Sequence, residues 1–143
     1  MLFNREITKD LPRAKKFFED ILSYTMGAYC LDKIIKEETN SINIVDVREY
    51  DDYIESHIPY AVHIPFKDAQ NHIDMLEKDK ITLVYTYNDN CPRAYKVALD
   101  LIEKHYPAEV LRGGFAKWQK LNFDTIKLDS ETHIQTEDCC CDD

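Results

Sequence analysis

The pattern of apolar and polar residues divides the chain into an N-terminal helix and a longer alternating region. From residue 11 to residue 24 the apolar side chains recur every three or four residues, which is the period of an amphipathic helix. Asp10 precedes this stretch as a capping residue, and Pro12 is compatible with a first helical turn. The apolar positions are Ala14, Phe17, Phe18, Ile21 and Leu22. We therefore predict a helix over residues 11–24.

Beyond residue 27, short apolar runs alternate with helical patterns. The run 42–47 is β-branched and largely apolar, which is typical of a strand buried on both faces. The predicted strands are 28–30, 42–47, 61–64, 81–85 and 109–111. The predicted helices are 31–38, 49–56, 68–78, 92–106 and 113–122. This alternation indicates an α/β domain with a mainly parallel central sheet.

Two of these helices carry specific expectations about burial. In the helix 68–78 we expect Ile73, Met75 and Leu76 to face the core. In the helix 92–106 the apolar stripe runs as far as His105, and Pro92 suits the first turn. Because ligands of open α/β sheets lie outside the carboxyl ends of the strands, the loop that follows Tyr85 is the expected site of chemistry.

Composition restricts the class of partner. The 143 residues are enough for one ordinary domain. The net charge of −9 argues against nucleic acid and against anionic membranes, because both require clustered cations. No apolar run approaches the length of a membrane span, and the charged N-terminus MLFNREITKD does not resemble a secretory signal. The five cysteines have no framework spacing, so we expect a cytoplasmic protein in a reducing compartment.

The loop after the strand 81–85 holds two candidate nucleophiles, Thr86 and Cys91. Threonine ionises far above neutral pH, whereas a cysteine thiolate attacks and carries sulfur. Cys91 precedes Pro92 at the predicted N-cap of a helix, where the helix dipole favours a thiolate. Asp89 opposes an anion there, and Arg93 offsets part of its charge. Cys91 is thus either a reactive thiol or simply a residue at a helix start.

Several motifs occur in a fixed order. They are Ile44-Val45-Asp46-Val47-Arg48, Ser56-His57-Ile58-Pro59-Tyr60-Ala61, Ile64-Pro65, Val84-Tyr85 and Arg112-Gly113-Gly114 followed by Trp118. Together they resemble the rhodanese-like domain family over residues 28–127. The resemblance implies a three-layer α/β domain with a mainly parallel sheet over residues 26–128. The N-terminal helical extension at 1–25 and a flexible Cys- and acid-rich tail at 129–143 are expected outside it.

The resemblance also implies roles for single residues. Active members carry sulfur as a persulfide on a cysteine directly after the Val-Tyr strand, and that position is Thr86 here. Cys91 matches a second cysteine that follows in longer loops of the family. The substrate-binding loop would comprise Tyr87, Asn88, Asp89, Asn90, Pro92 and Arg93. A structural rather than catalytic role is expected for Asp46, Arg48, His57, Gly114 and Trp118. Ser56 and Tyr60 stand where the family has glycine.

Two functions follow from this resemblance. One is a sulfurtransferase relative that lacks standard thiosulfate transfer because of Thr86, with Cys91 as its sole loop thiol able to carry sulfur. The other is a non-catalytic module that binds an anion or a protein. Phosphatase or arsenate reductase chemistry is weaker, because it also needs a cysteine at position 86 and Pro92 stands where its loop arginine is expected.

The expected partner is a small sulfur-containing anion or a protein, without a cofactor or metal. The histidines are scattered and lack the spacing of a metal site. The tail cysteines, Cys139, Cys140 and Cys141, are consistent with soft-metal binding or sulfur relay, or with an inert tail.

Overall fold

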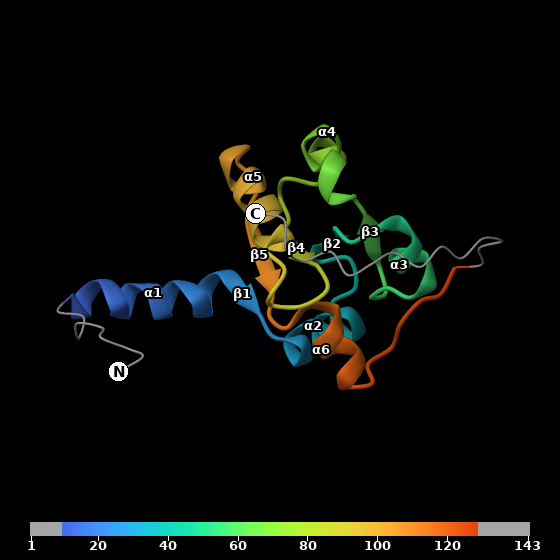
Figure 1. The fold of residues 1–143 in the computed structure, drawn as a ribbon, viewed down its shortest axis with the longest axis horizontal. Coiled ribbons are helices and arrows are strands. Elements are labelled where there is room, and N and C mark those ends of the chain that lie inside the picture. Colours follow the sequence, from blue (N-terminus) through green and yellow to red (C-terminus); the bar gives the residue numbers. More distant parts are fainter. Residues whose placement is uncertain (1–9, 129–143) are drawn as a thin grey trace, which may run out of the picture.

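Five parallel strands form the centre of the molecule in the order β1-β5-β4-β2-β3 (Figure 1). The structure is a computed structural model that describes residues 10–128. The strands are β1 (Thr25–Met26), β2 (Asn43–Asp46), β3 (Ala61–His63), β4 (Thr82–Tyr85) and β5 (Ala108–Leu111). Val45, Val84 and Val110 lie side by side across the three central strands. The predicted parallel α/β sheet is therefore confirmed.

Helices cover both faces of the sheet and create two apolar cores (Figure 1). One face packs against α5 (Arg93–Glu103) and a broken segment made of η1 (Phe66–Asp68), α4 (Ala69–His72) and η2 (Ile73–Met75). The other face packs against α2 (Ala28–Glu37) and α6 (Gly114–Lys120). Burial on both faces explains why the central strands are apolar without alternation.

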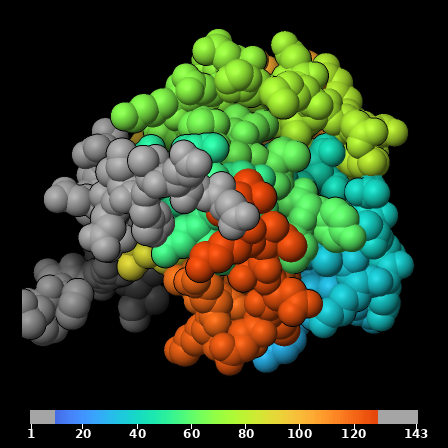
Figure 2. Space-filling model, turned by 90° about the vertical axis from the view of Figure 1, so that its right-hand side faces the viewer, coloured from blue at the N-terminus to red at the C-terminus, as the bar shows by residue number. Residues whose placement is uncertain are grey.

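The short helix α3 (Tyr50–Glu55) and the chain after α6 lie together at the β3 side of the sheet. The backbone N–H of His57 donates to the carbonyl of Ile126 at 2.9 Å, and the N–H of Ile126 donates back at 2.8 Å. The N–H of Leu128 donates to the carbonyl of Ile54 at 2.8 Å. Figure 2 shows this last segment in red, rising from α6 toward the green and cyan-green residues of the chain.

Two sequence predictions near the N-terminal half are wrong. The predicted strand 28–30 is the first turn of α2, and the edge strand is instead Thr25–Met26, which pairs with β5. Extended Gly27 separates the two elements. The predicted helix 68–78 is broken into three short pieces, and Met75 is 69% exposed rather than buried. Ile73 is buried and Leu76 packs against the core partly buried, both as predicted, and Ala69 is buried as well. These few apolar contacts do not hold one continuous helix.

The helix that follows the β4 loop is also shorter than predicted at both ends. α5 begins at Arg93 with Pro92 as its N-cap, so Cys91 lies one residue before the cap that we predicted it to form. The helix ends at Glu103, and His105 adopts a left-handed φ of 68° and is exposed. Tyr106, not His105, turns back into the core, and its N–H donates to the carbonyl of Leu101 at 2.9 Å. This backbone reversal is a common way to end a helix.

The N-terminal helix is confirmed as α1 (Leu11–Tyr24), with the Asp10 carboxylate accepting from the Arg13 N–H at 3.0 Å. In Figure 1 it extends away from the sheet, and no residue of this helix is buried. No helix within residues 10–128 is long and apolar enough to cross a membrane. The predictions for the tail at 129–143, including its three cysteines, fall outside the described residues.

Candidate functional site

The loop between β4 and α5 lies at the carboxyl edge of the sheet, as the α/β pattern predicts. It is bordered by the residues that follow β2 and by the start of α6. The N–H groups of Phe115 and Ala116 in α6 donate to the carbonyls of Thr86 and Tyr87, at 2.8 and 2.9 Å. The first turn of α6 therefore holds the loop by its backbone.

Thr86 and Cys91 face each other inside this loop. Thr86 is 3% exposed and Cys91 is 1% exposed. The Thr86 Oγ1 and Cys91 Sγ atoms lie 3.3 Å apart, within hydrogen-bonding distance for sulfur. The Cys91 sulfur therefore points into the protein toward Thr86. A donor molecule in solvent has no direct approach to it unless the loop opens.

Three backbone N–H groups in and beside the loop have acceptors within the chain. The N–H of Gly113 donates to the Asp89 carboxylate at 2.7 Å, and the N–H of Cys91 donates to the Asn88 carbonyl at 3.2 Å. The Asn88 side chain accepts from the N–H of Asn90 at 2.9 Å. Helix and turn N–H groups are the usual donors to a bound anion. Here the carboxylate of Asp89, rather than a bound anion, accepts from the N–H of Gly113.

The close approach of α6 to the loop depends on Gly114. This residue has a φ of 59°, and a Cβ atom there would lie 2.7 Å from the Thr86 carbonyl oxygen and 2.8 Å from the Asn88 nitrogen. Only glycine fits such a position without displacing backbone. The Gly114 of the sequence motif thus sets the distance between the helix and the loop.

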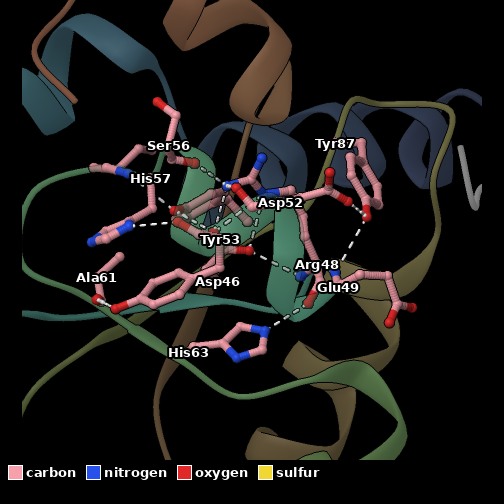
Figure 3. A network of polar contacts seen from close by, with 12 residues as sticks. Asp46, Arg48, Glu49, Asp52, Tyr53, Ser56, His57, Ala61, His63 and Tyr87 are labelled. Carbon is pink, nitrogen blue, oxygen red and sulfur yellow. Dashed lines mark hydrogen bonds and ion pairs between the residues drawn. The ribbon is translucent and has the colours of Figure 1, made fainter. Parts of the chain in front are cut away.

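A buried ion pair supports the site from beneath. Asp46 is fully buried and Arg48 is 4% exposed, with Arg48 Nη2 2.8 Å from Asp46 Oδ2 (Figure 3). The hydroxyl of Tyr85 donates to the same carboxylate at 2.7 Å, and Arg48 also donates to the Ser56 carbonyl at 2.6 Å. Burial works to lower the pKa of Arg48, but the charge and hydrogen bonds of Asp46 outweigh it and raise the pKa above its usual value. Arg48 therefore remains a cation that joins β2 to the end of α3.

Tyr87 turns away from the loop and joins it to α3 (Figure 3). Its hydroxyl donates to the Asp52 carboxylate at 2.5 Å and accepts from the Glu49 N–H at 3.2 Å. Burial, and then the bond to Asp52, raise the pKa of Tyr87 well above its usual value, so the hydroxyl stays a donor. Sequence reasoning missed Asp52. Several carboxylates lie in the predicted helix 49–56, and the sequence does not show which of them faces Tyr87.

Arg93 and Pro92 lie at the start of α5 beside the loop. Arg93 is nearly buried, and its Nη1 lies 3.0 Å from Glu49 Oε1. Its guanidinium also lies over the ring of Phe66, 5.3 Å from the centroid. The arginine predicted to offset Asp89 thus makes an ion pair with Glu49, whereas Asp89 bonds to the backbone of Gly113.

The remaining motif residues lie in packed positions. His57 is buried, stacked on Tyr53 with 3.9 Å between ring centroids, and its Nδ1 lies 2.7 Å from the Tyr53 carbonyl oxygen. Trp118 is fully buried and donates to the Asp124 carbonyl at 2.9 Å. Tyr60, which the resemblance places at a glycine position of the family, has a φ of 68°, a conformation favoured by glycine.

A cavity of about 540 Å³ opens between α3, the loop, α6 and the final segment. Its lining includes Arg48, Asp52, Tyr87, Asn88, Phe115 and Lys127. Two residues of the predicted binding loop, Tyr87 and Asn88, contribute to it, whereas Thr86 and Cys91 do not. Over residues 10–128, no group of three or more His, Cys, Asp and Glu side chains is arranged to hold a metal ion.

A family model for the rhodanese-like domain matches residues 28–121. The chain belongs to the rhodanese-like domain family. It is 35% identical over 79 residues to a thiosulfate sulfurtransferase, GlpE, of Coxiella burnetii, a match that spans 54% of this chain and 72% of the relative. It is 39% identical over 49 residues to the putative sulfur carrier protein YrkF of Bacillus subtilis, spanning 34% of this chain and 26% of that protein.

The fold has solved counterparts as well. The crystal structure of the BH2092 protein of Bacillus halodurans is similar, with a TM-score of 0.74 and 29% identity. The similarity covers 81% of this chain and 85% of that one. The predicted three-layer rhodanese-like architecture is confirmed, and the relatives place this chain among sulfurtransferase and sulfur-carrier homologues.

Proposed function

We propose that this rhodanese-like domain lacks standard thiosulfate sulfurtransferase activity and binds a protein segment at the edge of its former active site. The observation that carries the proposal is the pair Thr86 and Cys91. Thr86 occupies the place of the family's persulfide cysteine and has no thiolate to offer. Cys91 is 1% exposed, and its sulfur lies 3.3 Å from the Thr86 hydroxyl. The chain thus has no exposed thiol in this loop.

The electrostatics of the loop support the same conclusion. A persulfide site must attract an anionic donor, and Asp89 repels one. The cavity beside the loop carries charges of both signs, from Arg48 and Lys127 and from Asp52 and Glu55. Such a mixed lining gives a small anion little net attraction. It suits the alternating donors and acceptors of a polypeptide segment better.

A sulfur-loading experiment tests the catalytic part of the proposal. The full chain is incubated with thiosulfate, and the loop peptide is analysed by mass spectrometry under metal-free conditions. We expect no added sulfur at Cys91 in the wild type and none in Thr86→Ser. The double variant Thr86→Cys, Cys91→Ser is expected to gain a sulfur adduct, because it restores a thiol at the strand end. Sulfur on Cys91 of the wild type would show that the chemistry has moved to that residue and would overturn the proposal.

A binding experiment tests the second part. The immobilised full chain is exposed to an extract of the cells that make it, and the retained protein is compared among variants. We expect Gln119→Arg and Lys127→Glu, both exposed at the cavity, to lose the retained partner. Lys120→Glu is the control, because it makes the same charge change as Lys127→Glu at an exposed residue of α6 outside the cavity lining. This variant should bind the partner like the wild type. Equal retention by all variants would place the partner elsewhere.

A further inference from the structure

The helix α1 exposes large apolar side chains along its length. Leu11, Phe18 and Leu22 are 68%, 62% and 72% exposed, and Phe17 is 57% exposed. Leu11, Phe18 and Leu22 are spaced by seven and four residues, so they lie on one side of the helix. Phe17 and Phe18 contact each other edge to face, with ring centroids 5.4 Å apart. An apolar strip of this kind on a water-exposed helix indicates an interaction surface.

A neighbouring side of α1 borders an apolar groove against the body of the domain. A groove of about 480 Å³ separates α1 from α5, with a lining that is mainly apolar. Phe17 and Ile21 contribute from α1, and Tyr95, Leu99 and Ile102 from α5. The last three are 49%, 58% and 48% exposed. The interaction surface therefore comprises α1 together with the outer side of α5.

The apolar face of α1 lacks a packing partner within the described residues. It has 14 residues, none of them buried, and its contacts with the sheet are to β1 and β5 near its C-terminal end. Isolated helices of this length are marginal in water, and helices in proteins owe most of their stability to packing of the apolar face. In Figure 1 the helix projects from the domain, so the packing must come from outside the described fold.

The charges of α1 indicate which element would pack there. Its first half carries the cations Arg13, Lys15 and Lys16, and its second half carries the anions Glu19 and Asp20. This order is unfavourable with respect to the helix dipole, which prefers anions at the N-terminus and cations at the C-terminus. The internal pairs Lys15–Glu19 and Lys16–Asp20 also have the less favourable Lys-before-acid order. An antiparallel copy of the same helix would place anions beside the cations and reverse the dipole.

We propose that two copies of this chain associate through their α1 helices, packed antiparallel about a two-fold axis. In this arrangement Phe17 and Phe18 meet their own symmetry mates near the centre of the interface. Lys15 and Lys16 lie beside the partner's Asp20 and the partner's Glu19. The α1 helix of each copy also covers the apolar groove between α1 and α5 of the other copy. Such a self-complementary patch is the usual basis of a two-fold dimer.

A lipid surface fits this helix less well. Membrane-surface helices carry an excess of Lys and Arg on their polar face. From residue 10 to residue 24 the three cations are matched by three anions, Asp10, Glu19 and Asp20. The chain as a whole has a net charge of −9, which anionic lipids would repel. Pairing with a second copy would cover the apolar strip and would also place the cations of each helix beside the anions of the other.

Charge reversal tests the proposal directly. Sedimentation equilibrium of the full chain should show a dimer for the wild type. Lys15→Glu with Lys16→Glu should weaken the dimer by about tenfold or more, and Glu19→Lys with Asp20→Lys should do the same. A mixture of these two double variants should form a heterodimer, because each helix then faces the opposite charge. Rescue by mixing is a result that a general loss of helix would not produce.

Further variants serve as controls. Phe18→Asp should give a folded monomer, as checked by the thermal unfolding transition and the fluorescence of the buried Trp118. Met75→Asp, at another site with 69% exposure, should leave the dimer unchanged. A wild-type chain that stays monomeric at tens of micromolar would overturn the proposal. So would a monomer that instead co-sediments with vesicles of phosphatidylcholine and phosphatidylglycerol, which would identify the occupant as lipid.

Discussion

Asp46→Ala is expected to lower the free energy of unfolding by about 3–5 kcal/mol, because it leaves a buried cation without its counter-charge. Asp46 is fully buried and Arg48 is 4% exposed. The Asp46 carboxylate accepts from Arg48 Nε and Nη2, from the Arg48 N–H and from the Tyr85 hydroxyl. Removing one acceptor therefore leaves several donors unsatisfied at once. Chemical denaturation of the full chain, followed by Trp118 fluorescence, measures the loss.

The matched control is Glu77→Ala. Glu77 forms an ion pair with Lys80 on the surface, where its side chain is 60% exposed. Exposed pairs contribute no more than about 1 kcal/mol, so this variant should unfold close to the wild type. The double variant Asp46→Leu, Arg48→Met removes both charges and should recover part of the stability lost in Asp46→Ala. If Asp46→Ala proved no more harmful than Glu77→Ala, the buried pair would not hold the site together.

Gly114→Ala is expected to cost about 2–4 kcal/mol, from backbone strain and overpacking combined. Its φ of 59° is strained for any residue with a Cβ atom. That atom would also lie 2.7 Å from the Thr86 carbonyl oxygen and 2.9 Å from the Tyr87 carbonyl carbon. Both neighbours are backbone, so the clash is relieved only if α6 and the loop move apart. The same denaturation experiment measures the effect.

A second, independent measurement of Gly114→Ala is the accessibility of Cys91 in the loop. Because Gly114→Ala displaces the loop, Cys91 should be alkylated by iodoacetamide faster than in the wild type, as followed on its peptide by mass spectrometry. Gly27→Ala is the control, since Gly27 has a φ of −80° and its added Cβ would meet only the flexible end of the Arg112 side chain. It should cost less than about 1 kcal/mol and leave Cys91 protected. Equal protection of Cys91 in both variants would show that the loop does not depend on Gly114.

The elements that were predicted correctly are those whose burial produces a regular local spacing of apolar residues in the sequence. The central strands are buried on both faces, so each appears in the sequence as a short β-branched apolar run. The helix α1 has a capping aspartate and a clear helical spacing, and both ends were found. The segment 68–78 lacked such information. It forms three short pieces between β3 and β4, and of its predicted core residues Ile73 and Leu76 face inward whereas Met75 is exposed.

The candidate site shows the same division. The residue types of the loop, the threonine at its start and the acid within it were evident from the sequence. The hydrogen bond of Tyr87 to Asp52, and the pairing of Arg93 with Glu49, were not evident. These partners lie 35 and 44 residues apart along the chain. No local pattern specifies which of several carboxylates on one short helix will face a given loop.

The sequence by itself determined the order of strands and helices and the position of the loop after β4, because each follows from residue type and spacing. That Thr86 stands in place of a thiol is a prediction from the family resemblance. The tertiary structure alone decided that the Cys91 sulfur turns inward to Thr86 and that the Asp89 carboxylate accepts from the Gly113 N–H. The reason is geometric. Such contacts depend on the close approach of α6 to the loop at Gly114, and that approach exists only once the sheet has brought the ends of β4 and β5 together.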